Sequence, residues 1–179
     1  NRLTDIAPAL ALGVDPVPDD VMRRPPRRLT AHVIDGGMWL TVVATGLVMA
    51  VASLLALDLR LDGGFVGGSG SIDEGRTMAF TTLVLAQLFN CFNARSERVS
   101  AFRGLFANRW LWAAIALSVV LQVAVVQLAF LNDAFATTPL SLDEWLICVG
   151  LASAVLWTSE LMKLLASLWS SRRSASVRT

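Results

Sequence analysis

The chain has 179 residues, of which 55% are hydrophobic and only 16% charged, and its mean hydropathy is +0.60. Ordinary soluble domains carry about 25% charged residues, so this composition argues against a soluble domain and indicates an integral membrane protein. The formal net charge of +1 identifies no partner, and we expect none among nucleic acids.

Residues 1–13 have the pattern of an apolar helix that contains an acidic residue. In a helix Asn1, Thr4 and Asp5 are related by i, i+3 and i+4, so an amide, a hydroxyl and a carboxylate share one face. Pro8 has no N–H and leaves the Thr4 carbonyl free on the same turn. A hard cation prefers such a cluster of oxygen atoms. Taken alone, these residues also fit a soluble amphipathic helix in which Asp5 faces water.

A change of composition follows this helix. Residues 14–35 form a stiff polar loop that is rich in proline and arginine. Residues 36–57 carry no formal charge and, at about 1.5 Å per residue, they cross a hydrocarbon core of roughly 30 Å. A glycine-rich loop at residues 58–76 comes next, and its composition indicates flexibility and no further motif.

The second predicted span, residues 77–94, is less apolar than the first. Gln87, Asn90 and Asn93 recur along it on a slowly drifting face. Amides inside a bundle can join helices through hydrogen bonds worth around 0.6 kcal/mol each. For Asn90 we favour this structural role, and for Gln87 the residues alone leave it open.

Two more apolar stretches complete the bundle. Residues 110–132 open on tryptophans, which are typical of a membrane interface, and form the third span. Residues 145–169 form the fourth, and its charged residues are Glu160 and Lys163. Their i, i+3 spacing near one end of the helix indicates an anchor pair at the membrane surface rather than ion ligands.

Arginine is unevenly distributed among the connecting segments. It is abundant at 14–35, at 95–109 and in the C-terminal tail, scarce at 58–76 and missing at 133–144. The positive-inside rule then predicts that the arginine-rich segments are cytoplasmic and that the other two lie outside. This alternation argues against a soluble helical bundle.

The sequence therefore predicts an all-α integral membrane protein with half a helix followed by four spans. Its expected parts are an ion-site half-helix at 1–13, a coupling loop at 14–35, a four-span bundle at 36–169 and a frayed cytoplasmic tail at 170–179. The chain opens without an initiator methionine or a signal sequence, so we expect further protein upstream.

The two cysteines, Cys91 and Cys148, lie in different apolar stretches without metal-type spacing. Their expected depths differ by roughly 16 Å, and a disulfide needs Cα atoms within about 7 Å. We expect two free thiols.

Specific motifs carry a family resemblance. Residues 1–13 match the pattern N-x-x-T-D-x-x-P-A-x-A-L-G, and residues 20–27 end in M-x-x-P-P-R. Together they closely resemble the sixth transmembrane helix and following loop of type II, calcium-type P-type cation pumps. Residues 87–97 and 159–163 resemble the eighth and tenth helices of that family. The resemblance covers essentially the whole chain and implies helices 6 to 10 of an ATP-driven cation export pump, with Ca²⁺ as the expected ion.

The resemblance also implies a ligand set. Asn1, Thr4, Asp5 and Gln87 would supply oxygen atoms to the transported ion. Pumps of the family that bind two calcium ions have glutamate where Gln87 stands, so one ion per cycle is expected. Ile6 replaces a glycine that is frequent in the family, so we expect a smaller unwinding of the first helix.

The chain carries no glycine-rich nucleotide loop and no D-K-T-G motif, so ATP and Mg²⁺ would bind to upstream domains of the same pump. The expected surroundings are those domains, which the loop at 14–35 would contact, and the lipid bilayer of a bacterial plasma membrane. Two alternatives stay open. One is a non-catalytic membrane bundle or interaction protein, and the other is a P-type pump for Na⁺, K⁺, Mn²⁺ or H⁺, because hard oxygen ligands suit several ions.

Overall fold

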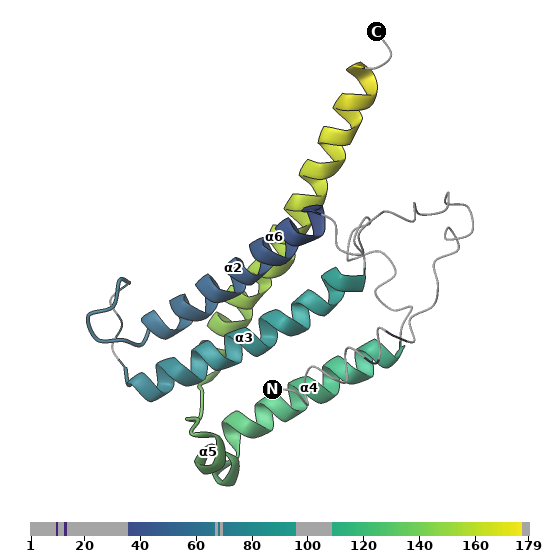
Figure 1. The fold of residues 1–179 in the computed structure, drawn as a ribbon. Helices are drawn as coiled ribbons and strands as arrows, with labels where there is room; N and C mark the ends of the chain where they lie inside the picture. The colour runs from purple at the N-terminus through teal and green to yellow at the C-terminus, as the bar shows by residue number, and fades with distance from the viewer. Residues whose placement is uncertain are drawn as a thin grey trace.

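The fold is that of a computed structural model, which describes residues 10, 13, 36–66, 68, 70–95 and 109–176 (Figure 1). The predicted ion-site half-helix, apart from Leu10 and Gly13, and the coupling loop lie outside these residues. The regular elements of the described residues are helices: α2 (Gly36–Asp58), α3 (Ile72–Arg95), α4 (Arg109–Gln127), α5 (Ala129–Phe135) and α6 (Leu142–Ser176). The prediction of an all-α fold is confirmed.

Three helices of the described part are long and apolar enough to cross a membrane. The spanning segments are Met38–Asp58, Arg109–Gln127 and Leu142–Leu165. They correspond to three of the four predicted spans and make this an integral membrane protein. α3, with 24 residues, has the necessary length, but it is more polar than the others, and its crossing stays a prediction.

The polarity of α3 follows from its central position. It packs along α2 and α6, while α4 lies beside it with sparser contact (Figure 1). Ala56 of α2, Ala86 of α3 and Val155 of α6 are fully buried in one apolar core. On α2, in contrast, side chains such as Trp39 and Leu40 are exposed. A helix surrounded by protein can carry polar groups that a lipid-facing helix cannot.

Cys91 and Cys148 are not joined to each other by a disulfide. Cys148 is fully buried in the apolar core, and Cys91 is half-buried on α3. Both therefore act as small side chains within the helix packing.

The third predicted span, residues 110–132, is wrong in its C-terminal part. α4 ends at Gln127, Leu128 takes an extended conformation with φ −89° and ψ 118°, and a separate helix α5 follows. Side chains from the following segment satisfy the carbonyls at this end. Thr137 Oγ1 donates to the Val125 carbonyl at 2.8 Å, and the Asn132 amide, oriented with its nitrogen toward α4, donates to the same carbonyl at 2.8 Å. The last carbonyls of a helix have no N–H group of a following turn to accept from. The helix can end here because these side chains donate to one of those carbonyls instead.

The helix that contains the fourth predicted span is longer than expected. α6 begins at Leu142 rather than at residue 145 and continues to Ser176, into the segment predicted to be a frayed tail. Hydropathy marks where a helix leaves the membrane, but the backbone hydrogen bonds of a helix do not depend on that boundary. The backbone at 170–176 is therefore helical.

Reciprocal capping boxes fix the starts of α3 and α6. In the first, the Ser71 N–H donates to Glu74 Oε2 at 3.3 Å and the Glu74 N–H to Ser71 Oγ at 3.2 Å. In the second, the Ser141 N–H donates to Glu144 Oε2 at 2.7 Å and the Glu144 N–H to Ser141 Oγ at 3.4 Å. The acidic side chains also complement the positive helix ends.

The loop between α2 and α3 is built around the carboxylate of Asp58. Its Oδ1 accepts a hydrogen bond from the Phe65 N–H and its Oδ2 one from the Val66 N–H, both at 2.9 Å. These bonds close the loop back onto the end of α2. The expectation that residues 58–76 carry no motif beyond flexibility is wrong for the described part of this loop, and its last residues already belong to α3.

Glycines in this loop serve close approach rather than mobility. A Cβ on Gly64 would lie 2.5 Å from Asp58 Oδ1, and one on Gly68 would overlap the backbone carbonyl of Leu59. Only glycine leaves room for these contacts.

An ion pair joins this loop to α6. Arg60 Nη2 lies 2.5 Å from Glu144 Oε1, and the Glu144 side chain is only 7% exposed. A buried carboxylate without a partner would cost several kcal/mol. The ion pair with Glu144 therefore holds the Arg60 side chain in place.

We expect Asp58→Ala to release the loop. Hydrogen bonds to a charged acceptor contribute roughly 1.5 to 3 kcal/mol, so amide exchange at Phe65 and Val66 should become at least about tenfold faster. Hydrogen exchange measured by mass spectrometry on the loop peptide checks this. Asp62→Ala removes the same charge from the same loop and should leave protection unchanged. Equal exchange in the two variants would contradict the role of Asp58.

Candidate functional site

The structure places one of the four predicted ligands. Asn1, Thr4 and Asp5 lie outside the described residues, whereas Gln87 lies in the middle of α3. The described part of the candidate site is therefore the surroundings of this amide.

The side-chain oxygen of Gln87 is buried and has no hydrogen-bond partner among the described residues. Burying an amide oxygen in this way costs about 1 to 3 kcal/mol, and a bilayer supplies no water to replace the partner. The backbone carbonyl of Gln87 accepts a hydrogen bond from the Cys91 thiol at 3.3 Å. The side-chain oxygen is thus the atom of this residue that can accept a ligand contact.

The two glutamines of the α4 segment behave differently. Gln122 Nε2 donates to Thr81 Oγ1 of α3 at 3.1 Å, and the two residues are 2% and 0% exposed. Gln127 Nε2 donates to the Leu140 carbonyl at 2.8 Å. These amides join separate elements of the bundle, so their role is structural.

The sequence alone gave Asn93 no role. In the structure this residue links α3 to α6. Its Nδ2 donates to the Val155 carbonyl of α6 at 3.4 Å, and its Oδ1 is buried without a partner among the described residues. The signal was present in its i+6 spacing from Gln87. Asn90 is half-buried, and its predicted role as a link between helices stays a prediction.

Two adjacent threonines of α3 differ in whether their hydroxyl groups are hydrogen-bonded. Thr81 and Thr82 are both fully buried, but the Thr81 hydroxyl accepts a hydrogen bond, whereas Thr82 Oγ1 has no hydrogen-bond partner in the part of the chain that the structure describes. Thr82 lies beside the Cys148 thiol, and that thiol donates to the Met78 carbonyl at 3.6 Å.

Among the described residues, no three side chains of His, Cys, Asp or Glu come together in a group that could hold a metal ion. Glu160 and Lys163 form an ion pair with each other at 3.1 Å, with side chains 17% and 18% exposed. This pairing agrees with their interpretation as an anchor pair. Their depth in the membrane stays a prediction.

Comparison with known proteins identifies the family. The family described as "Cation transporting ATPase, C-terminus" matches residues 1–165, which include the three predicted ligands of the first helix. The chain belongs to this family. It matches 83 curated relatives, and the three described next are named as calcium-transporting ATPases.

The chain is 41% identical over 158 residues to "Calcium-transporting ATPase 7, plasma membrane-type" of Oryza sativa subsp. japonica, which covers 88% of the chain. It is 32% identical over 180 residues to "Calcium-transporting ATPase 1" of Schizosaccharomyces pombe, which covers 100% of it, and 33% identical over 153 residues, or 86% of the chain, to "Calcium-transporting ATPase" of Bacillus subtilis. It spans 15%, 19% and 17% of these relatives, respectively.

We expect Thr81→Val and Thr82→Val to have different effects on this C-terminal ATPase region. Thr81→Val leaves the Gln122 amide unpaired and should lower stability by about 1 kcal/mol, within the range for hydrogen bonds between membrane helices. Thr82→Val removes a hydroxyl that has no hydrogen-bond partner among the described residues, and it should be neutral or stabilising. Unfolding of the complete pump in detergent measures both. A loss in Thr82→Val as large as that in Thr81→Val would contradict the assignment.

Proposed function

We propose that the chain is the C-terminal membrane domain of an ATP-driven pump that exports Ca²⁺, and that it supplies part of the transmembrane ion site. One observation carries the proposal: the central helix of a cation-transporting ATPase region holds a buried amide oxygen, on Gln87, without a partner among the described residues. A cation bound there compensates the lost hydrogen bond.

The proposed ligand set is Asn1, Thr4, Asp5 and Gln87. Asp5 supplies negative charge, which offsets the desolvation of the ion, while the other three supply neutral oxygen atoms. Because Gln87 is neutral, its helix adds no charge for a second ion. We therefore propose one ion per cycle.

The choice of Ca²⁺ is supported by the relatives, which are named as calcium-transporting ATPases. Oxygen ligands alone suit Na⁺, K⁺, Mn²⁺ or H⁺ as well, so ion identity rests on this similarity. ATP and Mg²⁺ would be bound by upstream domains. A non-catalytic bundle is disfavoured, because the matched region includes Asn1, Thr4 and Asp5 together with Gln87.

We also propose a plasma-membrane location with residues 14–35, 95–109 and the C-terminus in the cytoplasm. The arginine distribution supports this orientation, and one of the relatives is named as plasma membrane-type. The bacterial origin stays a prediction, since the relatives include plant, yeast and bacterial proteins.

The proposed function predicts that Asp5→Asn abolishes calcium-dependent phosphorylation by ATP in the complete pump. The substitution keeps the shape but removes the carboxylate charge, and an uncompensated ion in a membrane interior costs several kcal/mol. The measurement is phosphoenzyme formation against cation concentration, repeated with Na⁺, K⁺ and Mn²⁺. A normal calcium titration in folded Asp5→Asn protein would show that Asp5 is structural, and activation of the wild type by another cation alone would refute the choice of Ca²⁺.

Gln87→Ala should have a smaller effect, a several-fold loss of apparent calcium affinity, because it removes a neutral ligand and no charge. Gln127→Ala is the matched control. It deletes the same amide, but one whose nitrogen is bonded to the Leu140 carbonyl, so the calcium titration should not shift. If Gln87→Ala titrates like the wild type, its oxygen is not a ligand.

The topology predicts that cysteines introduced at positions 30 and 65 react from opposite sides of the membrane. Labelling with an impermeant thiol reagent in sealed vesicles, in a background without Cys91 and Cys148, measures this. Labelling of both positions from one side would refute the orientation.

A further inference from the structure

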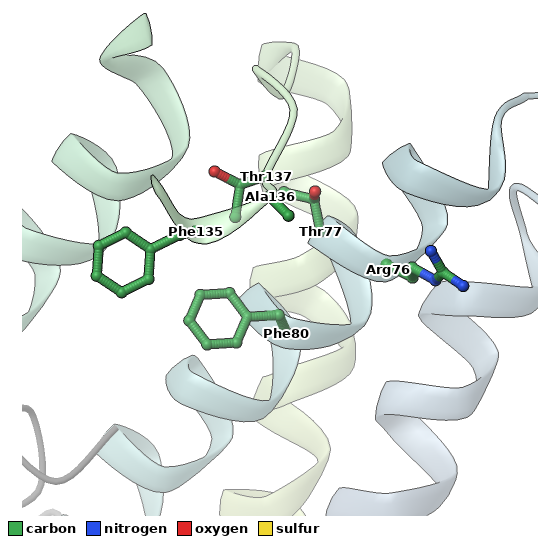
Figure 2. Close-up of a pocket in the computed structure, with 6 residues that line it drawn as sticks. All are labelled: Arg76, Thr77, Phe80, Phe135, Ala136 and Thr137. Atoms are coloured by element: carbon green, nitrogen blue, oxygen red, sulfur yellow. The ribbon is translucent and has the colours of Figure 1, made fainter. Parts of the chain in front are cut away.

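A cleft opens between the start of α3 and the segment that follows α5. It has a volume of about 230 Å³ and is lined by Arg76, Thr77, Phe80, Phe135, Ala136 and Thr137. Figure 2 shows the rings of Phe80 and Phe135 on one side of the two threonines, and the Arg76 side chain on the other side, where its guanidinium extends outward from the edge of the cleft. The interior of the cleft is therefore apolar where the rings lie, and a cation stands at its edge.

Hydrogen bonds already use the hydroxyl groups of the cleft. Thr77 Oγ1 donates to the Asp73 carbonyl at 2.9 Å and accepts from the Thr138 N–H at 3.0 Å. Thr137 Oγ1 donates to the Val125 carbonyl at 2.8 Å. These bonds hold the two walls of the cleft in place. Among the lining side chains, Arg76 is then the one whose N–H groups can donate to a ligand.

Arg76 is held only weakly by its own partner. Its Nη1 lies 3.3 Å from Asp73 Oδ1, and the two side chains are 66% and 62% exposed. An ion pair this exposed contributes little, about 0 to 1 kcal/mol. Arg60, at the same end of the bundle, instead forms an ion pair with the buried Glu144. A phosphate can replace Asp73 at Arg76, since guanidinium binds phosphate through paired hydrogen bonds.

The cleft lies where the spans end. The α2 span ends at Asp58, the α4 span ends at Gln127, and the α6 span begins at Leu142. Next to the cleft, α5 buries none of its residues and exposes Phe130 and Phe135. Exposed apolar side chains at the end of membrane spans meet acyl chains, and charged side chains there reach headgroups.

We propose that this cleft binds an anionic phospholipid. The headgroup phosphate contacts Arg76, and the first part of an acyl chain lies along Phe80 and Phe135. A headgroup without an ammonium group is preferred, because an ammonium would bring a second positive charge to Arg76. This site is separate from the proposed ion site and does not depend on it.

The test uses the complete pump in detergent with a photoreactive phosphatidylglycerol, and quantifies cross-links to the peptide that contains Phe135. Unlabelled phosphatidylglycerol should compete more strongly than phosphatidylcholine. Diacylglycerol, which lacks the phosphate, and glycerol phosphate, which lacks the acyl chains, should compete weakly. Equal competition by diacylglycerol or by glycerol phosphate would overturn the proposal, and so would equal competition by phosphatidylcholine.

Variants separate a phosphate contact from an effect of the surface ion pair. Arg76→Gln should reduce the cross-link about tenfold, as expected for the loss of a charge-assisted contact, and Arg76→Lys should retain most of it. Asp73→Asn is the matched control, because it removes the same ion pair but leaves the cation, so cross-linking should be unchanged or increased. A parallel loss in Asp73→Asn and Arg76→Gln would overturn the phosphate contact, as would wild-type cross-linking in Arg76→Gln.

Discussion

A polar group inside a bilayer is costly unless it is paired within the protein, because the hydrocarbon offers no partner. This constraint accounts for the arrangement of the described bundle around α3. Thr81 meets Gln122 of α4, and Asn93 meets a carbonyl of α6. Exposed to lipid, the same side chains would destabilise the helix. The most polar helix is therefore the one that α2, α4 and α6 all contact.

The same requirement shapes the membrane boundary, where helices end. Asp58 is the last residue of α2, and a carboxylate at a helix C-terminus is unfavourable by about 0.3 to 1 kcal/mol. Two hydrogen bonds from the Phe65 and Val66 N–H groups outweigh that penalty. Glu144 caps α6 with one oxygen and binds Arg60 with the other. Carboxylates thus join α2 and α6 to the loop between α2 and α3 at one end of the bundle.

Three of the four predicted spans coincide with apolar helices of spanning length, but the sequence did not predict where α4 and α6 end. Long uncharged stretches locate a helix in a membrane, but the end of α4 depends on Thr137 and Asn132, which fold back onto its carbonyls. Residue 128 is a leucine, not a proline or a glycine, so the sequence at this position does not indicate that the helix ends. The continuation of α6 to Ser176 was missed for another reason, since a change to polar residues ends a membrane span without ending a helix.

The candidate site shows the same limit. Gln87 and Gln122 look alike in sequence, as single amides in apolar stretches. Only the structure separates them, because Gln122 finds Thr81 across the interface with α4 while the oxygen of Gln87 finds no partner among the described residues. Pairing between helices is a tertiary property, and sequence spacing along one helix does not encode it.

The unpaired oxygen also constrains how an ion site on α3 can work. A glutamate at position 87 would leave a buried charge whenever no ion is bound, at a cost of several kcal/mol, whereas a neutral amide costs about 1 to 3 kcal/mol. α3 is an uninterrupted helix from Ile72 to Arg95 and packs against three neighbours, so it can tolerate the smaller penalty without rearranging. On the proposed ligand set, the charge lies on Asp5, three residues before Pro8 in the sequence, and proline cannot donate a helical hydrogen bond. We therefore expect the structural response to ion binding to fall on the segment around Asp5, while α3 stays fixed and presents one oxygen atom.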